Sequence, residues 1–361
     1  MESKKEKKNE KLTVIDLFSG CGGFSYGFES AGFDVLLGID NDGMALKTFE
    51  ANHNGSKALN LDLHKEETID RIVKETKNRG VDVIIAGPPC QGFSLTGARK
   101  EHDERNVLFY SVFKLAKRLN PKAIIIENVP GLATLYEGKA KEGILKEFKK
   151  LGYTFNYKVL YAPDYEVPQI RKRIFFVGLK PEFGTFEFPK PVLTKEKYNT
   201  CEKAISDLPP RVKDLGKEID KYSSEPKSEY QKRLRAKSVF LYNHLATKHT
   251  DHVINVISQV PEGGNHKDLP PGVGDSRIFN EAWTRYHSKR PSKTIDTGHR
   301  NHFHYKLNRI PTVRENARLQ SFPDNFVFQG NRTQQYRQVG NAVPPLLGFH
   351  VAKQLLKFIK K

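Results

Sequence analysis

Cysteine is scarce in this 361-residue chain, and the few positions it occupies disfavour two common kinds of site. The chain has three cysteines, Cys21, Cys90 and Cys201, and none of them belongs to a C-x-x-C pair. Disulfide frameworks and structural zinc sites need several cysteines at short, regular spacings. We therefore expect Cys90 to be either structural or catalytic, with little room for a zinc or redox centre.

Long apolar runs are also missing. No run approaches the roughly 20 apolar residues that a membrane span requires. The charged stretch 1–11 is not followed by an apolar segment of the kind that a signal peptide carries. We expect a disordered basic tail at residues 1–11 and an intracellular protein.

Acidic residues are in deficit. The chain has 60 Lys and Arg against 42 Asp and Glu, which leaves a formal net charge of +18. An excess of this size favours a polyanionic partner, most often a nucleic acid. The alternative is a generic basic surface without a dedicated partner.

What the chain does contain, from residue 12 to about 180, is an alternation of short apolar runs with amphipathic stretches. This alternation is typical of a mostly parallel sheet with helices on both faces, an α/β fold of the Rossmann-like kind. The runs interpreted as strands are 13–18, 34–40, 58–62, 81–87, 122–129, 153–165 and 173–179.

The composition changes near residue 181, where proline, aromatic and scattered charged residues replace the regular pattern. We expect a catalytic and cofactor-binding domain at 12–185 and a smaller, irregular domain at 186–330. The end of the chain reverts to an amphipathic pattern over 344–361. The segment 331–361 is therefore expected to pack back on the first domain.

A glycine-rich turn, DLFSGCGGFSYGF at 16–28, follows the first predicted strand. Glycine lets a ligand approach the backbone closely because it has no Cβ. Asp40 ends the next predicted strand, and a carboxylate there can bind ribose hydroxyls. A dinucleotide fingerprint would need a third glycine where Ser25 stands, and no G-K-[ST] sequence follows. The pattern favours a nucleoside-type cofactor, and the alternative is a tight turn without a ligand.

Three polar groups follow later predicted strands. GPPCQGFS (87–94) sets Cys90 behind two prolines that restrict the backbone, at the strand edge where such sheets hold active sites. Glu127 follows the next strand and could exchange a proton with a ring nitrogen. In QIRKRIFF, Gln169, Arg171 and Arg173 alternate and so share one face of a strand. Each also has an alternative without a catalytic role. Cys90 could be an inert thiol, Glu127 a solvated turn residue, and the alternating residues a charged strand edge.

Histidines gather at LYNHLATKHTDH and GHRNHFHY. Neither cysteines nor paired carboxylates accompany them, so we favour a solvated or nucleic-acid-facing surface over a metal site. The histidines concerned are His244, His249, His252, His299, His302 and His304.

The order of these motifs carries more information than any one of them. DLFSGCGGF, GPPCQGFS, ENV, Q-x-R-x-R, a long variable stretch, RPSKTI, REN-ARLQSFPD and QVGNAVPP follow one another along residues 12 to about 354. This series resembles the DNA (cytosine-5-)-methyltransferases, and most of all the single-chain bacterial modification enzymes of type II restriction-modification systems. The resemblance implies a transferase that moves a methyl group from S-adenosyl-L-methionine to C5 of a cytosine flipped out of duplex DNA, without a metal.

The resemblance also implies roles for individual residues. Cys90 would attack cytosine C6, Glu127 would assist at N3, and Arg173 would bind O2. In much of the family a Glu holds the cofactor ribose, whereas the matching position here is Asp40. The catalytic set is Cys90, Gln91, Glu127, Arg171 and Arg173; the cofactor set is Phe18, Gly20, Gly22, Gly23, Asp40, Asp62, Leu63, Pro89, Leu108 and Asn341.

Double-stranded DNA is the implied partner, and a base must leave the stack before C6 can be reached. The segment 186–330 matches the region that recognises the target sequence. A restriction endonuclease acting on the same site, a monomeric state and a cytoplasmic, nucleoid-associated location are further expectations. The residues expected to contact DNA are Ser94, Thr96, Arg99, Lys100 and Gln169.

Three other functions compete with this interpretation. A transfer-RNA cytosine methyltransferase would share the motifs, although the long variable stretch favours a DNA reader. A noncatalytic nucleic-acid-binding relative is disfavoured by the intact Cys90, Gln91 and Glu127. A Rossmann oxidoreductase is disfavoured by the absent third glycine.

Overall fold

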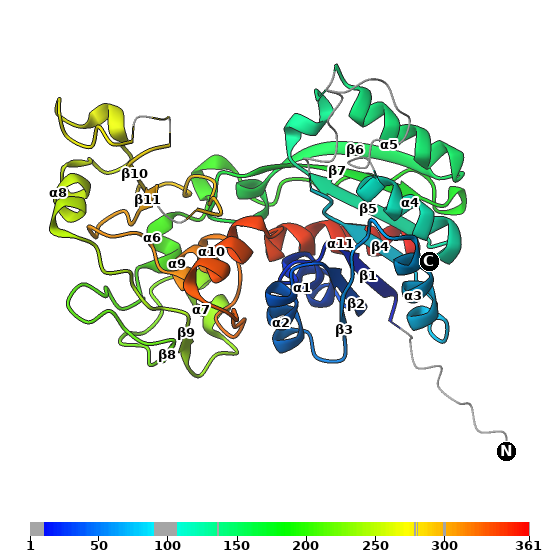
Figure 1. Ribbon diagram of the computed structural model, residues 1–361, viewed down its shortest axis with the longest axis horizontal. Coiled ribbons are helices and arrows are strands. Elements are labelled where there is room, and N and C mark those ends of the chain that lie inside the picture. The colour runs from blue at the N-terminus through cyan, green and yellow to red at the C-terminus, as the bar shows by residue number, and fades with distance from the viewer. Residues whose placement is uncertain are drawn as a thin grey trace.

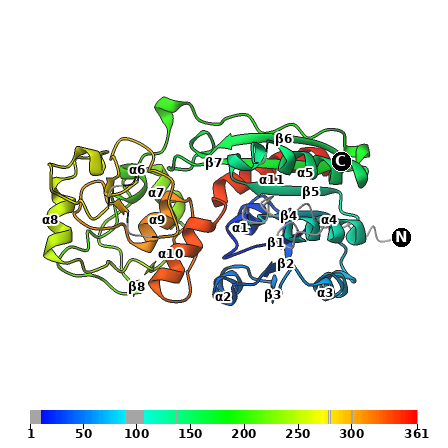
Figure 2. The same cartoon turned by 45° about the horizontal axis from the view of Figure 1, so that its top comes forward.

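The chain folds into two lobes that lie side by side, and a long C-terminal helix runs from their junction along the first lobe (Figures 1 and 2). The structure is a computed structural model, and it describes residues 11–89, 107–135, 137–277, 279, 281–298 and 301–360. Within these residues, no helix is both long enough and apolar enough to span a membrane.

A seven-stranded sheet forms the centre of the first lobe, in the order β3-β2-β1-β4-β5-β7-β6. Strands β1 to β5 pair in parallel, and β7 runs antiparallel to both of its neighbours. This confirms the predicted α/β fold with a mostly parallel sheet. The strands are β1 (Thr13–Leu17), β2 (Asp34–Asp40), β3 (Lys57–Asn60), β4 (Val83–Ala86), β5 (Ala123–Asn128), β6 (Thr154–Tyr161) and β7 (Lys172–Leu179).

Helices cover both faces of this sheet, because successive side chains of a strand point to opposite faces. One face packs on α3, α4 and α5 and the other on α1, α2 and α11. Neighbouring residues of β1 illustrate the division, since Ile15 belongs to the first of these cores and Val14 to the second. The helices are α1 (Gly23–Ser30), α2 (Gly43–Asn52), α3 (Glu66–Thr76), α4 (Val107–Leu119), α5 (Lys139–Lys150) and α11 (Pro345–Ile359).

The close contact between α1 and α11 depends on small residues. A Cβ on Gly27 would lie 2.6 Å from the backbone N of Phe349 and 2.6 Å from the carbonyl O of Pro345. Only glycine therefore allows the two helix backbones to approach so closely. The C-terminal helix thus packs against α1 of the first lobe.

The second lobe has short elements around a core of its own. That core also takes Tyr336 and Val339 from α10, so it extends beyond the expected domain limit at residue 330. The elements are α6 (Cys201–Ile205), β8 (Ile219–Asp220), α7 (Glu229–Arg235), β9 (Leu241–Tyr242), α8 (Asp251–Gln259), β10 (Thr284–Arg285), β11 (His302–Phe303), α9 (Val313–Leu319) and α10 (Arg332–Asn341).

Buried charges hold this irregular lobe together. The guanidinium of Arg318 donates to Asp207 Oδ1 at 2.5 Å and to Asp324 Oδ2 at 2.7 Å, and all three side chains are fully buried. Arg309 binds Glu315 through two hydrogen bonds of 2.7 and 2.8 Å. Because each buried charge has a partner, these pairs fix neighbouring segments relative to one another.

Three of the clustered histidines are also part of this interior. His244 is fully buried, with Nδ1 2.8 Å from Thr312 Oγ1 and Nε2 2.7 Å from the carbonyl O of Pro209. His302 and His304 are buried as well. The expectation of a solvated or nucleic-acid-facing histidine surface was wrong for these three. His304 Nδ1 accepts from the backbone N of Lys306 at 3.0 Å and of Leu307 at 3.2 Å, so His244 and His304 both bond to polar groups inside the lobe.

Candidate active site

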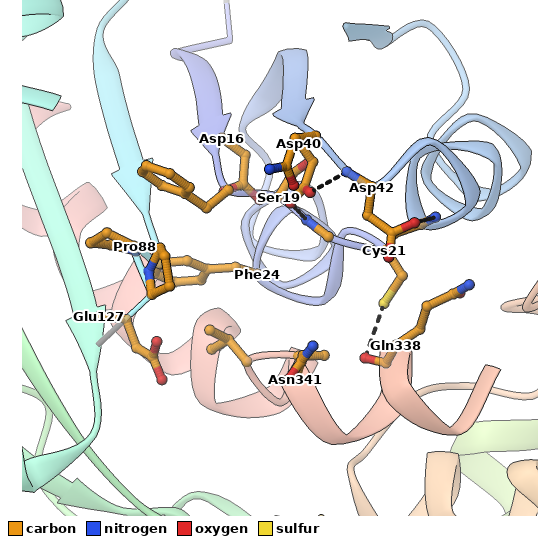
Figure 3. A pocket seen from close by; sticks show the side chains of 18 of the residues that line it. Asp16, Ser19, Cys21, Phe24, Asp40, Asp42, Pro88, Glu127, Gln338 and Asn341 are labelled. Atoms are coloured by element: carbon orange, nitrogen blue, oxygen red, sulfur yellow. Dashed lines mark hydrogen bonds between the residues drawn. The ribbon is translucent and has the colours of Figure 1, made fainter. Parts of the chain in front are cut away.

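A cavity of about 820 Å³ opens at the carboxyl ends of β1, β2, β4 and β5. This is the edge at which parallel sheets bind ligands. In Figure 3, Asp16, Asp40 and Asp42 lie on one side of the cavity, and Glu127 and Asn341 on the other. The second lobe contributes part of the wall through Arg337, Gln338, Gly340 and Asn341 of α10, so both lobes build the site.

The glycine turn after β1 lines one side of this cavity. Phe18 and Gly20 both have positive φ, at 61° and 52°, which bends the chain sharply around the end of the strand. The direction of a Cβ on Gly20 is open, with no atom of the described residues within 4 Å. The turn therefore leaves room for a ligand beside its backbone.

Asp40 is held beside this turn by two backbone amides. Gly20 N donates to Asp40 Oδ2 at 2.8 Å, and Asp42 N donates to Asp40 Oδ1 at 2.8 Å. Burial raises the pKa of Asp40 above its usual range, and the two amides oppose that shift. The carboxylate lines the cavity with its orientation already fixed.

Two of the predicted cofactor glycines serve packing in the structure. A Cβ on Gly22 would lie 2.1 Å from Nε2 of the buried His53, and one on Gly23 would lie 2.5 Å from the carbonyl O of Val343. Neither residue is among those that line the cavity. These glycines let the turn and the start of α1 sit close to α2 and to the chain before α11.

Asp16 and Ser19 line the cavity and were not singled out from the sequence. Asp16 is almost completely buried, and its Oδ2 accepts a 2.6 Å hydrogen bond from Ser25 Oγ. Burial raises the pKa of Asp16 to about 8. Ser19 Oγ is buried and has no hydrogen-bond partner among the residues that the structure describes. The available signal was a carboxylate inside an otherwise apolar strand, which is rarely tolerated without a function.

The far end of the cavity combines apolar and acidic side chains. Leu63, Pro89 and Leu108 are among the residues lining it, together with Asp62. Asp62 Oδ1 accepts from the backbone N of His64 at 3.0 Å and lies 2.9 Å from His64 Nδ1. These hydrogen bonds hold the pKa of Asp62 below its usual range. These side chains suit a ligand with a flat apolar ring and polar edges.

Glu127 and Arg173 form an ion pair inside the same cavity. Arg173 Nε donates to Glu127 Oε1 at 2.9 Å, and both side chains are mostly buried. The pairing arises because β5 and β7 are antiparallel neighbours. Burial raises the pKa of Glu127 above its usual range, although the two nearby arginines oppose the shift. The site therefore holds a carboxyl group that takes up a proton more readily than one in water.

Arg171 supports this pair from deeper inside. It is buried, and its Nη2 donates to the carbonyl O of Gly340 at 3.0 Å and of Ala342 at 3.2 Å. Burial lowers the pKa of Arg171 to about 9. Its Nε is buried without a partner. Arg171 thus links the first lobe to the connection between α10 and α11.

Gln169 does not line the cavity, and none of its surface is exposed. Its Oε1 accepts from Arg171 Nη1 at 3.4 Å and from the backbone N of Ile295 at 3.3 Å, and its Nε2 donates to Gln320 Oε1. A side chain buried in this way cannot touch DNA in this conformation. The placement fits support of Arg171, and it corrects the expected direct DNA contact.

The turn that leads toward Cys90 is tied to the end of β5. Asn128 Nδ2 donates to the carbonyl O of Pro88 at 2.9 Å, and Asn128 Oδ1 accepts from the backbone N of Val129 at 2.8 Å. Residues 90–106, which follow Pro89, lie outside the part of the chain that the structure describes. They include six with predicted roles: Cys90, Gln91, Ser94, Thr96, Arg99 and Lys100.

Two further cavity residues came from the second lobe and were missed by sequence analysis. Arg337 Nη2 donates to Asp42 Oδ2 at 2.5 Å, and Gln338 Oε1 accepts from Thr48 Oγ1 at 2.7 Å. Both pairs join residues almost 300 positions apart in the sequence. No local pattern in the sequence predicts such contacts.

Cys21 also lines the cavity but differs from an activated thiol. It is buried, its Sγ lies 3.7 Å from the carbonyl O of Gln338, and burial raises its pKa to about 12. A thiol with so high a pKa is a poor nucleophile. Cys201 is fully buried in the second lobe, where burial likewise raises its pKa. Among the chain's cysteines, these two are therefore structural.

Comparison with known proteins agrees with this arrangement. Residues 12–357 match the sequence model of the C-5 cytosine-specific DNA methylases. The type II methyltransferase M1.HphI of Haemophilus parahaemolyticus is 40% identical, over 96% of this chain and 87% of that protein. M.DdeI of Desulfomicrobium norvegicum is 36% identical, over 95% and 88%. A solved E. coli structure, named as a prophage-encoded DNA modification methyltransferase, superposes with a TM-score of 0.80 at 27% identity, over 97% of this chain and all of that one.

Proposed function

Because the chain belongs to the family of C-5 cytosine-specific DNA methylases, we propose that it methylates cytosine in a specific duplex DNA sequence through a covalent bond between Cys90 and C6 of the base. The observation that carries the proposal is the buried Glu127–Arg173 pair in the cavity that the glycine turn also lines. That pair offers a proton and a cation to a cytosine ring. The cavity offers a neighbouring space for a methyl donor.

The reaction needs covalent help because C5 of cytosine is a weak nucleophile. The Cys90 thiolate attacks C6 and forms an S–C6 bond, while Glu127 hydrogen-bonds the ring and supplies the proton to N3. Electron density then reaches C5, which bonds the methyl carbon while the bond from that carbon to the donor's sulfonium sulfur breaks and leaves a neutral thioether. A base then removes the C5 proton, the S–C6 bond breaks to release the Cys90 thiolate, and N3 returns its proton to Glu127, which restores the ring. Covalent catalysis of this kind divides one difficult step into easier ones.

Arg173 and Arg171 have different parts in this scheme. Arg173 is paired with Glu127 and lines the cavity, so its guanidinium can bind O2 of the cytosine. Arg171 is buried behind it and bonded to carbonyl oxygens of the second lobe. We assign Arg171 a positioning role, supported by Gln169, and keep the contact with the base for Arg173.

S-adenosyl-L-methionine is the methyl donor that the family uses, and it supplies the methyl group as an electrophile when bound. The cavity fits such a molecule on three observations: the open side of Gly20, the unpartnered buried Ser19 Oγ, and the fixed Asp40 carboxylate. Asp40 would bind the ribose hydroxyls, and Asp62 would accept from the adenine amino group. Phe18, Leu63, Pro89, Leu108 and Asn341 would complete the surroundings.

The DNA partner follows from the family, and the finer assignments are proposals. The segment 186–330 would read the target sequence, and Ser94, Thr96, Arg99 and Lys100 would contact the strand around a flipped base. The relatives M1.HphI and M.DdeI are named as type II methyltransferases. We infer from them a paired restriction endonuclease acting on the same site, and we propose that the methyltransferase acts as a monomer in the bacterial cytoplasm.

One experiment tests the substrate and the nucleophile together. Purified protein would be incubated with S-adenosyl-L-methionine and, separately, with mixed-sequence duplex DNA or transfer RNA, and nucleosides would be analysed by mass spectrometry. We expect 5-methylcytosine in DNA, and none with Cys90→Ala, which should still fold and bind the cofactor. If 5-methylcytosine appeared only in the RNA sample, the substrate would be RNA and not DNA. Near-normal product with Cys90→Ala would refute the mechanism.

A further inference from the structure

A second cavity, of about 260 Å³, lies at the junction of the two lobes. Its walls come from α1, α7, the chain after α9 and the start of α11, which Figure 1 shows near that junction. It shares no lining residue with the candidate active site. We call it the junction cavity.

Helix α1 separates the two cavities. Phe24 of this helix lines the candidate active site, whereas Tyr26 and Ser30 line the junction cavity. Each residue advances about 100° around an α-helix, so Tyr26 and Ser30 share one face and Phe24 lies on nearly the opposite one. A ligand in the junction cavity would therefore not occupy the space of the methyl donor.

The junction cavity is mostly apolar. Its walls include Leu234, Pro323, Pro345, Leu346 and Phe349. An apolar cavity of about 150 Å³ is enough for benzene, and pockets for drug-sized molecules begin near 300 Å³. At about 260 Å³ the space suits one or two fused rings with a short chain.

The charged groups around the junction cavity have one sign. Arg233 and Lys237 of the α7 region line it, and the described lining residues include no carboxylate. Arg233 Nη1 is already paired with Glu166 Oε1 at 2.9 Å. Lys237 is exposed and forms no ion pair with any other described residue. The rim therefore favours an anionic group near Lys237.

One polar atom inside is left without a partner. Asn325 lines the junction cavity, where its side-chain amide hydrogen-bonds with Tyr26, and its Oδ1 is buried with no hydrogen bond to any described residue. A buried acceptor that has lost its hydrogen bonds to water and gained no other donor is energetically unfavourable. A ligand that donates a hydrogen bond at this point would remove that penalty.

From the apolar walls, the cationic rim and the unpartnered amide oxygen, we propose that the junction cavity binds a small aromatic carboxylate that carries a hydrogen-bond donor. The ring would lie against Leu346 and Phe349, the carboxylate near Lys237 and the donor at Asn325 Oδ1. This site is separate from the cofactor and DNA sites of the proposed function. It would give the protein a sensitivity to small organic acids at the joint between its lobes.

Indole-3-propionate is a suitable probe, because it joins a fused ring, an N–H donor and a carboxylate. Its binding to the full chain would be measured by calorimetry, with and without saturating S-adenosyl-L-homocysteine. We expect binding of one molecule per chain in both conditions. Lys237→Ala should weaken it about two- to fivefold, as expected for an exposed charge pair, and the neutral indole-3-propionamide should lose a similar factor.

The matched control is Lys232→Ala, which removes an exposed lysine of α7, five residues before Lys237, that does not line the junction cavity. It should bind the probe as the unchanged protein does. Ala236→Phe, at an exposed lining position, should fill the entrance and abolish binding without lowering the melting temperature. The proposal is overturned by no binding at millimolar probe, by competition with S-adenosyl-L-homocysteine, or by equal affinity in Lys237→Ala and Lys232→Ala.

Discussion

Glu127 is the residue whose protonation should control the rate. Burial raises the pKa of its carboxyl, so the protonated fraction of the folded protein falls as pH rises through that raised value. A step that needs Glu127 to give a proton to the base should slow over the same range. We expect the single-turnover methylation rate to decrease toward alkaline pH.

Glu127→Gln separates the proton from the hydrogen bond. Glutamine keeps an N–H donor near Arg173 but cannot transfer a proton, so methylation should fall about 10²- to 10⁴-fold. The residual rate should also lose the alkaline decrease. Rates measured between acid and alkaline pH on one DNA duplex would test this, and an unchanged profile in the variant would assign the titration to another group.

We expect Asp16 to lower the free energy of unfolding at neutral pH when no ligand is bound. Its carboxyl pKa is raised from 3.8 to about 8, so the folded state holds a proton that the unfolded state has lost between these values. The free energy of unfolding must therefore decrease as pH rises from about 4 to 8. Asp16→Asn stays neutral at every pH, so it should remove this pH dependence. At pH 8 its free energy of unfolding should exceed that of the unchanged protein by more than about 1 kcal/mol.

Urea unfolding at pH 5 and pH 8 measures the effect of Asp16 directly. The difference between the two proteins should be small at pH 5 and large at pH 8. A difference that does not change with pH would mean that Asp16 stays ionised in the folded protein. The sequence allowed Asp16 to be noticed as a charge in an apolar strand, but its burial against Ser25 depends on how α1 packs.

At the scale of elements, α2 joins the two lobes through two side chains one turn apart. Asn52 Oδ1 accepts from Val327 N at 2.7 Å, and Asn52 Nδ2 donates to Val327 O at 2.9 Å. Thr48 Oγ1 accepts from Gln329 N at 2.8 Å and donates to Gln338 Oε1 at 2.7 Å. Since Gln338 lines the active-site cavity, this joint ties the second lobe to the cofactor side of the first.

Asn52→Ala should loosen the joint. Two hydrogen bonds to the backbone of Val327 are lost, so the free energy of unfolding should fall by about 1–3 kcal/mol. The KM for S-adenosyl-L-methionine should rise because Gln338 is held less firmly. Asn54→Ala, at an exposed position two residues on, is the control and should change neither quantity. Equal effects of the two substitutions would contradict a role for the joint.

Replacing glycine by alanine should have opposite effects on stability at two positions. Gly27 lies in the contact of α1 with α11, whereas Gly143 lies in α5, away from that contact. In Gly27→Ala the new methyl would meet backbone atoms of Phe349 and Pro345, which cannot move aside as side chains can. We expect a loss of at least about 2 kcal/mol in unfolding free energy, in the range of overpacked cores. Gly143→Ala in α5 meets nothing within 4 Å and should gain about 0.5–1 kcal/mol.

Thermal melts of both glycine variants would decide the matter. Tolerance of Gly27→Ala would show that the contact of α1 with α11 is not limited by backbone approach. Destabilisation by Gly143→Ala would contradict the gain expected for an unobstructed helical glycine. The strands and helices themselves could be predicted from the sequence, because period-two and helical patterns are local. The contact of Gly27 with Pro345 and Phe349 could not, because it joins segments more than 300 residues apart.

At the scale of the whole molecule, the sequence predicted two regions but not how they share one site. The carboxyl-edge residues Asp40 and Glu127 could be found because each ends an apolar run. From the same helix as Arg337 and Gln338, only Asn341 was expected at the cofactor, because the contacts that bring the other two to the cavity join residues almost 300 positions apart. Arg314 and Arg318 belong to the REN-ARLQSFPD motif, and carbonyl and carboxylate partners let both be fully buried.

The net charge of +18 makes its own prediction for the assembled molecule. A protein that neutralises DNA phosphates releases counterions, so the association constant falls steeply with salt. If the chain contacts six or more phosphates, DNA affinity should drop at least about 10³-fold between 50 and 200 mM salt. Fluorescence polarisation of a labelled duplex, with the cofactor product present, would give the slope of log affinity against log salt.

Cofactor affinity provides the internal control for this salt series. S-adenosyl-L-homocysteine binds in a partly enclosed cavity without a row of phosphates, so its affinity should change little over the same range. A steep slope for DNA with a flat one for the cofactor would assign the positive charge to the DNA interface. A flat slope for DNA would mean that few lysines and arginines reach the phosphates, and recognition by 186–330 would then have to supply the affinity through base contacts and shape.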